Sequence, residues 1–247
     1  GSGKSTTLYS MLSELNKPGV NISTVEDPVE YTLDGIHQVQ VIREKGLDFS
    51  RALRSLMRQD PDIILVGETR GKETAQAAME AALTGHMVFT TLHANDTSTA
   101  ITRLAEMEIP PYLIGASIVG LVAQRLVRKV CKSCSEFKQV NPSENQLAFS
   151  MGVKKARFFR KNNIECPICD GTGYKGRVGI YEVMQVNDLI RELIMKESNA
   201  EEIREIAFKS KGRSLLSYGM DLVKNEITTI EEVERVCLLN DSPNESQ

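Results

Sequence analysis

The spacing of hydrophobic residues along the first half of the chain changes repeatedly between a helical and a strand-like period. A helix over residues 5–15 is predicted from apolar positions three or four apart: Leu8, Met11, Leu12 and Leu15. Strands are predicted in "VNISTVED" and "IHQVQV", and a second helix in "FSRALRSLMR". The chain therefore begins with alternating helices and strands.

Two uninterrupted apolar runs follow, with an alanine-rich stretch between them. "DIILVGE" and "MVFTTLH" have the composition of strands buried on both faces of a parallel sheet, and residues 73–83 predict a helix that Gly85 closes. Strands that alternate with helices in this way indicate an α/β fold with a doubly wound sheet. Such sheets bind ligands at the carboxyl ends of their strands.

The pattern changes near residue 130. Residues 131–186 contain cysteine pairs and a glycine-rich run, and residues 187–247 are charged with helical spacing. We therefore expect three parts: a core over 1–130, a small tetracysteine module over 131–186, and a C-terminal helical region over 187–247.

The composition excludes some classes of protein. The 247 residues are 41% hydrophobic and 26% charged, as in a globular protein with a core of its own. A net charge of −3 makes non-specific binding to nucleic acid the less favoured alternative. The longest stretch without charge, residues 109–124, is too short and too interrupted to span a bilayer, which predicts a soluble chain.

The first six residues, "GSGKST", have the pattern of a phosphate-binding loop that runs into a helix. Backbone N–H groups at a helix N-terminus attract an anion, the lysine reaches the outer phosphates, and a serine or threonine hydroxyl completes a magnesium shell. These six residues match only the second half of that motif, so a flexible glycine–serine end is the alternative. The predicted ATP-binding residues are Gly1, Ser2, Gly3, Lys4, Ser5 and Thr6.

Carboxylates follow two of the predicted strands. Glu68 comes directly after "DIILVG", where it would face the phosphate loop and its metal. Glu26, Asp27 and Glu30 follow another strand, and three carboxylates so close together would repel one another unless a cation or a substrate-bound water justifies them. Exposed acidic loops are the alternative in both places.

Histidines and arginines complete the candidate site. His86 and His93 flank "MVFTTL" and could reach the same end of the sheet, although a lone histidine is often structural. Arg54 and Arg58 lie four apart, so they share one helical face where they could contact phosphates, a neighbouring subunit or only solvent.

The cysteines predict a metal site. Cys131 and Cys134 form one C-x-x-C pair, Cys166 and Cys169 form another, and Cys237 is left over. Two such pairs supply four thiolates for a closed tetrahedral zinc site, which indicates a structural metal rather than a redox pair. This use of cysteine is typical of a reducing cytosol.

With these motifs in place, the chain resembles the secretion ATPases of type II secretion and type IV pilus assembly. The matching stretches are "GSGKSTTLYSML", "TVEDPVEY", "LMRQDPDIILVGETR", "TGHMVFTTLHANDT", "LVAQRLVRKVC", "GTGYKGRVGIYEVM" and "ITTIEEVERV". They extend over nearly the whole chain.

The resemblance implies a RecA-like P-loop NTPase core that hydrolyses ATP with Mg2+. Lys4 and Ser5 would bind the triphosphate and magnesium, with Thr6 close by. Glu30 would position or activate the attacking water, and Glu68 would act through the metal. His86 and His93 would sense the γ-phosphate region or couple it to subunit motion.

The resemblance also implies partners and a location. The family works as a cytoplasmic homo-hexamer at the inner membrane, on the platform protein of a pilus or secretion machine, and the tetracysteine module favours assembly over retraction. Family members carry a further N-terminal domain that supplies arginines to the nucleotide, so we expect residues 1–247 alone to hydrolyse ATP poorly. A DNA-uptake or nucleic-acid motor on the same core, and a non-catalytic ring subunit, are the alternative functions; no specific nucleic acid is expected.

Overall fold

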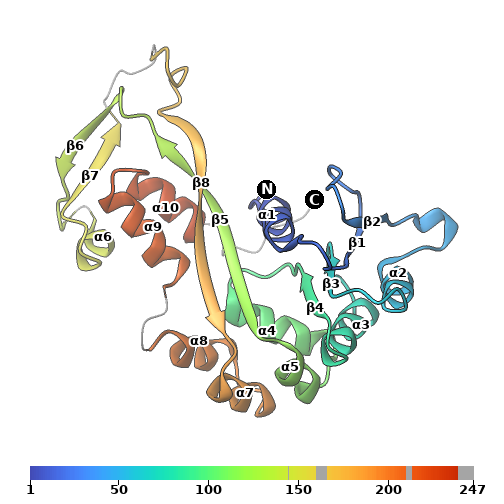
Figure 1. Ribbon diagram of the computed structural model, residues 1–247. Helices are drawn as coiled ribbons and strands as arrows, with labels where there is room; N and C mark the ends of the chain where they lie inside the picture. The colour runs from blue at the N-terminus through green and yellow to red at the C-terminus, as the bar shows by residue number, and fades with distance from the viewer. Residues whose placement is uncertain (144, 160–165, 210–212, 239–247) are drawn as a thin grey trace. The chain divides into compact units, whose positions relative to one another are not determined.

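The computed structural model describes residues 1–143, 145–159, 166–209 and 213–238, which group into two compact units (Figure 1). The α/β unit comprises residues 4–121 and 184–209. The cysteine unit comprises residues 1–3 and the described residues within 122–183 and 213–238.

A four-stranded parallel sheet organises the α/β unit. Its strands, in the order β2-β1-β3-β4, are β2 (His37–Gln40), β1 (Ile22–Glu26), β3 (Ile63–Val66) and β4 (Met87–Thr90). Because all four run the same way, their carboxyl ends lie along one edge of the sheet, the carboxyl edge, and their starts along the opposite, amino edge. β1 and β3 are buried throughout because they occupy the middle of the sheet.

Helices cover both faces of this sheet. Ile63 and Leu65 of β3 pack in a cluster with α1 (Lys4–Leu15), whereas Ile64 and Val66 pack with α2 (Phe49–Leu56) and α3 (Lys72–Leu83). Alternate side chains of a strand point to opposite faces, so α1 lies on one face and α2 with α3 on the other. The doubly wound α/β fold predicted from the sequence is confirmed.

A further hydrophobic core of the α/β unit lies among its helices. It includes Ile101, Ile114 and Ile190, all nearly inaccessible to solvent. The remaining elements of the unit are the 3-10 helix η1 (Arg43–Lys45) and the helices α4 (Thr97–Glu106), α5 (Pro111–Ser117), α7 (Asp188–Met195) and α8 (Ala200–Phe208).

The cysteine unit has a core of its own, in which Ala148, Met220 and Val233 are fully buried. Its elements are the antiparallel pair β6 (Ser135–Gln139) and β7 (Lys155–Phe159), and the helices α6 (Gln146–Ser150), α9 (Leu215–Lys224) and α10 (Ile230–Cys237). β5 (Gly120–Val130) and β8 (Tyr174–Gln185) pair in a two-stranded sheet whose strands contribute residues to both units (Figure 1).

One detail of the predicted pattern is wrong. β4 is an edge strand in which Met87 is 49% exposed, so its apolar run does not mark a strand buried on both faces. The predicted helix over residues 5–15 is present as α1, and its buried residues are Tyr9 and Leu12. The division at residues 130 and 186 stays a prediction.

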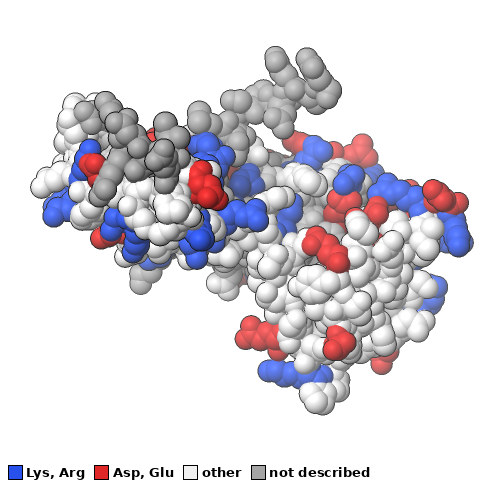
Figure 2. All heavy atoms as spheres, turned by 90° about the horizontal axis from the view of Figure 1, so that it is seen from above, with Lys and Arg blue, Asp and Glu red and all other residues white. Residues whose placement is uncertain are grey.

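The surface carries charges of both signs. On the face drawn in Figure 2, Lys and Arg side chains lie in small groups with Asp and Glu among them, in keeping with a net charge of −3. Across the described ranges, every helix falls short of the length or the apolar character that crossing a membrane requires.

Candidate active site

The N-terminus of α1 lies at the carboxyl edge of the sheet. Tyr9, in the second turn of α1, contacts Glu26 at the end of β1, and Leu12, further along the helix, packs in one cluster with Ile22 at the start of β1. The helix therefore runs antiparallel to the strand and begins where the strand ends. Gly3 has a φ of +85°, a left-handed conformation that suits glycine, and Lys4 and Ser5 form the first turn of the helix after it. Backbone N–H groups at such an end are a favourable place for a phosphate.

Glu68 lies at the same edge, two residues after β3 ends. Its neighbours hold it in place: the Gly67 carbonyl accepts a hydrogen bond from Thr91 Oγ1 at 2.7 Å, and the Thr69 N–H donates to the Thr91 carbonyl at 2.8 Å. The Glu68 carboxylate forms an ion pair of 2.6 Å with Arg70 Nε, and His93 Nε2 lies 3.8 Å away. Glu68 and His93 therefore share one corner of the carboxyl edge.

Protein side chains contact two of the three carboxylates at the carboxyl end of β1. Glu26 is buried and accepts hydrogen bonds from three side chains, whereas Asp27 pairs with Arg43 Nη2 at 2.9 Å. Glu30 is exposed to solvent. Protein donors thus satisfy Glu26 and Asp27, and a cation or substrate-bound water beside the exposed Glu30 stays a prediction.

Tyr9 and Glu26 form a contact that the sequence did not predict. The Tyr9 hydroxyl donates to Glu26 Oε2 and accepts from the Glu30 N–H at 3.3 Å. Burial, together with the hydrogen bond to the Glu26 carboxylate, raises the pKa of Tyr9 far above its usual value, so the phenol stays protonated. A tyrosine on the inner face of a helix is the signal that could have revealed it, since a buried hydroxyl requires a partner.

Three predicted residues lie away from this edge. His86 precedes β4 at the amino edge, where its Nδ1 contacts the Ala81 carbonyl at 2.9 Å, so the expectation that both histidines reach the same sheet end is wrong for His86. Arg58 follows α2 next to Gln59, whose carbonyl accepts from Asn21 at the amino end of β1. Arg54 lies one turn earlier and its carbonyl accepts from Arg58 at 2.9 Å. Arg54 and Arg58 therefore lie away from the phosphate-binding N-terminus of α1 in the same chain.

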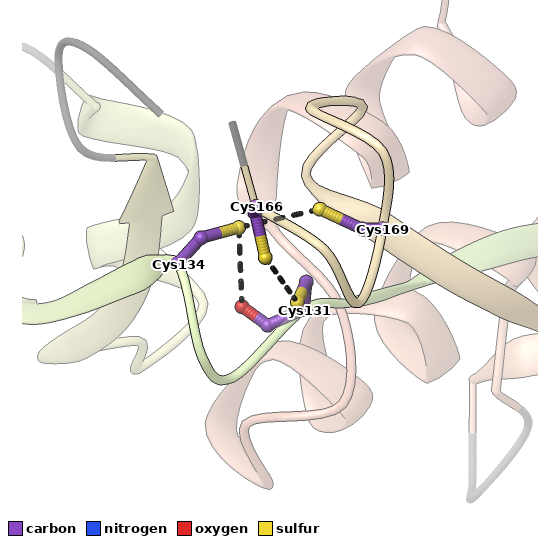
Figure 3. A group of neighbouring side chains, drawn as sticks. All are labelled: Cys131, Cys134, Cys166 and Cys169. Carbon is purple, nitrogen blue, oxygen red and sulfur yellow. Dashed lines mark hydrogen bonds between the residues drawn. The ribbon is translucent and has the colours of Figure 1, made fainter. Parts of the chain in front are cut away.

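The four paired cysteines meet in the cysteine unit, where their Sγ atoms point toward one another (Figure 3). Cys131 and Cys134 follow β5, and Cys166 and Cys169 precede β8. All four sulfurs lie within 4.8 Å of one another, with 3.5 Å between Cys134 and Cys169 and 3.9 Å between Cys131 and Cys166. A tetrahedral zinc with Zn–S bonds of about 2.3 Å separates its sulfurs by about 3.8 Å, so the cluster fits that ion.

The surroundings of the thiols suit a bound cation. Burial raises the pKa of the Cys134 thiol to about 12, whereas backbone N–H groups of Ile168 and Cys169 lower the pKa of Cys166 to about 7. The Gly173 N–H also donates to Cys169 Sγ at 3.3 Å, a contact that favours the thiolate. A metal ion would supply the positive charge that several buried thiolates require.

Comparison with known proteins places this arrangement in a family. Residues 1–235 match the family described as "Type II/IV secretion system protein". The chain belongs to this family. Members with similar sequences include the "Type IV pilus assembly ATPase PilB" of Thermus thermophilus, 48% identical over 235 residues, and the "Type II secretion system ATPase E" of Vibrio cholerae, 45% identical over 236 residues.

These family members are longer than the chain. The aligned region covers 94% of the chain and 26% of the Thermus thermophilus protein, and 96% of the chain and 46% of the Vibrio cholerae protein. Among solved structures, the "Pilus Retraction Motor PilT" with bound ADP has a similar fold, with a TM-score of 0.69 and 27% identity over 96% of this chain and 58% of that chain.

Proposed function

We propose that the chain is the nucleotide-hydrolysing part of a Mg2+-dependent ATPase that drives pilin or pseudopilin assembly. The observation that carries this proposal is the position of Lys4 and Ser5 at the N-terminus of α1, on the same sheet edge as Glu68 and His93. The family membership supports it, since relatives in this family are named as pilus assembly and secretion ATPases.

In this proposal, each residue of the edge has a role in phosphoryl transfer. Lys4 and the N–H groups of Gly1–Thr6 bind the phosphates, and Ser5, with Thr6 close by, presents a hydroxyl to the metal. Mg2+, when bound, neutralises charge on the phosphate oxygens. Exposed Glu30 orients the attacking water, Glu68 faces the metal, and His93 lies beside Glu68 to respond to the terminal phosphate.

The substitution Lys4→Ala tests this proposal in the intact protein. We expect ATP hydrolysis to fall by about 100-fold or more, because the phosphates lose the charge that holds them and stabilises the transition state. Lys17→Ala removes an exposed lysine just beyond the same helix and should leave the rate unchanged. Steady-state phosphate release with and without Mg2+ measures both, and hydrolysis that persists in Lys4→Ala would overturn the assignment.

We also propose that the four clustered cysteines hold a structural zinc. The sulfur separations and the backbone N–H groups around Cys166 and Cys169 support this ion. With four protein ligands a zinc has no open position, so it would stabilise the cysteine unit rather than take part in hydrolysis.

The machine and the assembly are proposed from the same resemblance. Relatives of similar identity serve both type IV pilus assembly and type II secretion, at 48% and 45%. We propose a cytoplasmic homo-hexamer at the inner membrane, with a platform protein as partner and with Arg54 and Arg58 available for subunit contacts. Native mass measurement of the intact protein tests the hexamer, and loss of pili or of secretion in a Lys4→Ala strain distinguishes the machines.

A further inference from the structure

The loop that carries Glu30 is held by side chains from two elements of the α/β unit. From β2, Gln38 Oε1 accepts from the Leu33 N–H at 2.7 Å, and its Nε2 donates to the Tyr31 carbonyl at 3.2 Å. From α1, the Tyr9 hydroxyl accepts a hydrogen bond from the Glu30 N–H at 3.3 Å. The Tyr9 ring packs edge-on against the Tyr31 ring, with 4.7 Å between the ring centres. The loop is therefore held at Glu30 and at two residues that follow it.

The two side chains that hold this loop, Tyr9 and Gln38, both donate hydrogen bonds to the buried carboxylate of Glu26. Glu26 is 5% exposed, and its two oxygens accept from Tyr9, from Thr24 Oγ1 at 2.5 Å and from Gln38 Nε2 at 3.2 Å. Tyr9 and Gln38, which hold the loop, are thus both bound to Glu26. A buried carboxylate with three donors is a rigid anchor, because each donor would lose its partner if the group moved.

Glu26 also determines how the Tyr9 hydroxyl is oriented. A phenol has one proton, and a carboxylate can only accept, so the Tyr9 proton points to Glu26. The oxygen lone pairs are then left for the Glu30 N–H, which can only donate. The direction of the chain of hydrogen bonds from Glu26 through Tyr9 to Glu30 is therefore set by chemistry.

We propose that Tyr9 and Glu26 are positioning residues that hold the backbone of Glu30 beside the phosphate-binding end of α1. This role rests on the proposed ATPase function, in which Glu30 orients the attacking water. Tyr9 lies in the second turn of the helix whose first turn contains Lys4 and Ser5, so the same rigid helix sets both the phosphate contacts and the water-orienting carboxylate. A displacement of about 1 Å at such a group can cost about 100-fold in rate.

The substitution Tyr9→Phe in the intact protein tests the inference. It removes the hydroxyl and keeps the ring that packs on Tyr31. We expect kcat for ATP hydrolysis to fall by about 10- to 100-fold while the KM for ATP changes by less than about threefold, because the phosphate contacts remain. Amide hydrogen exchange of residues 27–33 should accelerate by about tenfold, since the Glu30 N–H loses its acceptor.

Two further variants make the test specific. Glu26→Gln keeps the side-chain volume but adds a donor beside Tyr9, so it should lower kcat in the same way. Tyr174→Phe removes a hydroxyl that contacts Thr229 in the cysteine unit and should leave kcat and the exchange of residues 27–33 unchanged.

The outcomes separate this inference from the proposed function. Normal kcat in Tyr9→Phe, or unchanged exchange of residues 27–33, overturns the positioning role while Glu30→Gln still abolishes hydrolysis. A lower melting temperature with normal kcat likewise shows a merely structural tyrosine and overturns the role. If Glu30→Gln itself hydrolyses ATP normally, the proposed role of Glu30 fails, and the inference fails with it.

Discussion

Glu232 of α10 is a fully buried carboxylate held between two arginines of the cysteine unit. Arg128 Nη2 donates to it at 2.6 Å and Arg235 Nη2 at 2.7 Å, and the Arg128 guanidinium also lies 4.0 Å from the centre of the Tyr174 ring. Burial by itself would raise the pKa of Glu232, but the hydrogen bonds from Arg235 and Arg128 outweigh it and lower the pKa to about 2. The carboxylate therefore stays ionised in the folded protein.

The substitution Glu232→Gln should destabilise the protein by about 3 kcal/mol near pH 7, because two arginines lose a charged acceptor. The folded-state pKa is depressed from 4.5 to about 2, so the ion pair stabilises the fold fully above about pH 4.5 and loses this effect as pH falls toward 2. Urea unfolding of both proteins between pH 7 and pH 3 measures the difference.

Glu231→Gln provides the control for that series. Glu231 is the exposed neighbour of Glu232 on the same helix, so its substitution should change the free energy of unfolding by less than about 0.5 kcal/mol. A Glu232→Gln deficit that stays constant down to pH 3 would contradict the ion-pair origin of the effect.

At the active-site edge, sequence reasoning could place residues by strand ends but could not predict their pairings. Glu68 and His93 each follow a strand of one parallel sheet, so their shared edge follows from topology. His86 also adjoins a strand, but it precedes that strand, and a residue before a parallel strand lies at the opposite edge. The Tyr9–Glu26 contact depends on which face α1 turns to the sheet, and aliphatic spacing alone does not determine that.

At the scale of elements, the three α-helices and four strands between residues 4 and 90 were predictable because apolar period and turn residues agree there, whereas α4 and α5 were not predicted. The strand order was not predictable, since β3 and β4 have similar apolar runs and only the pairing β2-β1-β3-β4 makes β4 an edge strand. The close packing of α9 on α10 was not predictable either, because it depends on the small residue Gly219 and not on apolar period.

The substitution Gly219→Ala should destabilise the packing of α9 on α10. A Cβ at Gly219 would lie 2.6 Å from Val233 Cγ1, closer than two carbons can approach. We expect a loss of about 1–3 kcal/mol from overpacking, which outweighs the gain of about 1 kcal/mol that alanine brings to a helix. Urea or thermal unfolding measures the net effect.

Gly115→Ala in α5 is the matched control. Its Cβ would meet Ile194 Cγ2 at 3.9 Å, an ordinary contact, so alanine there should be neutral or stabilising by up to about 1 kcal/mol. Adding Val233→Ala to Gly219→Ala should recover part of the loss by removing the clash. Equal effects of the two glycine substitutions would contradict a steric origin.

At the scale of the whole molecule, the sequence indicated a cysteine module, but chain order could not reveal which distant segments complete its core. The described residues within 122–183 group with residues 213–238, whereas residues 184–209 group with the α/β unit. The chain thus passes between the units more than once. Apolar period does not encode such exchanges, because it reports which face of a helix is buried and not against which partner.

Because the cysteines lie in one of the two units, we expect metal removal to affect the cysteine unit and not the parallel sheet. We expect close to one zinc per chain, lost in Cys131→Ser and retained in Cys237→Ser, because Cys237 lies outside the cluster. Without the ion, no bond joins the Cys131–Cys134 pair after β5 to the Cys166–Cys169 pair before β8, so the two loops lose their link.

Amide hydrogen exchange should therefore rise in residues 122–143 and 166–183 after chelation, while residues 22–66 of the parallel sheet keep their protection. Elemental analysis and exchange measured on the same samples check both parts. A zinc content near zero in the untreated protein would overturn the metal assignment. Equal loss of protection in the sheet and around the cysteines would contradict the separate cores from which the prediction was made.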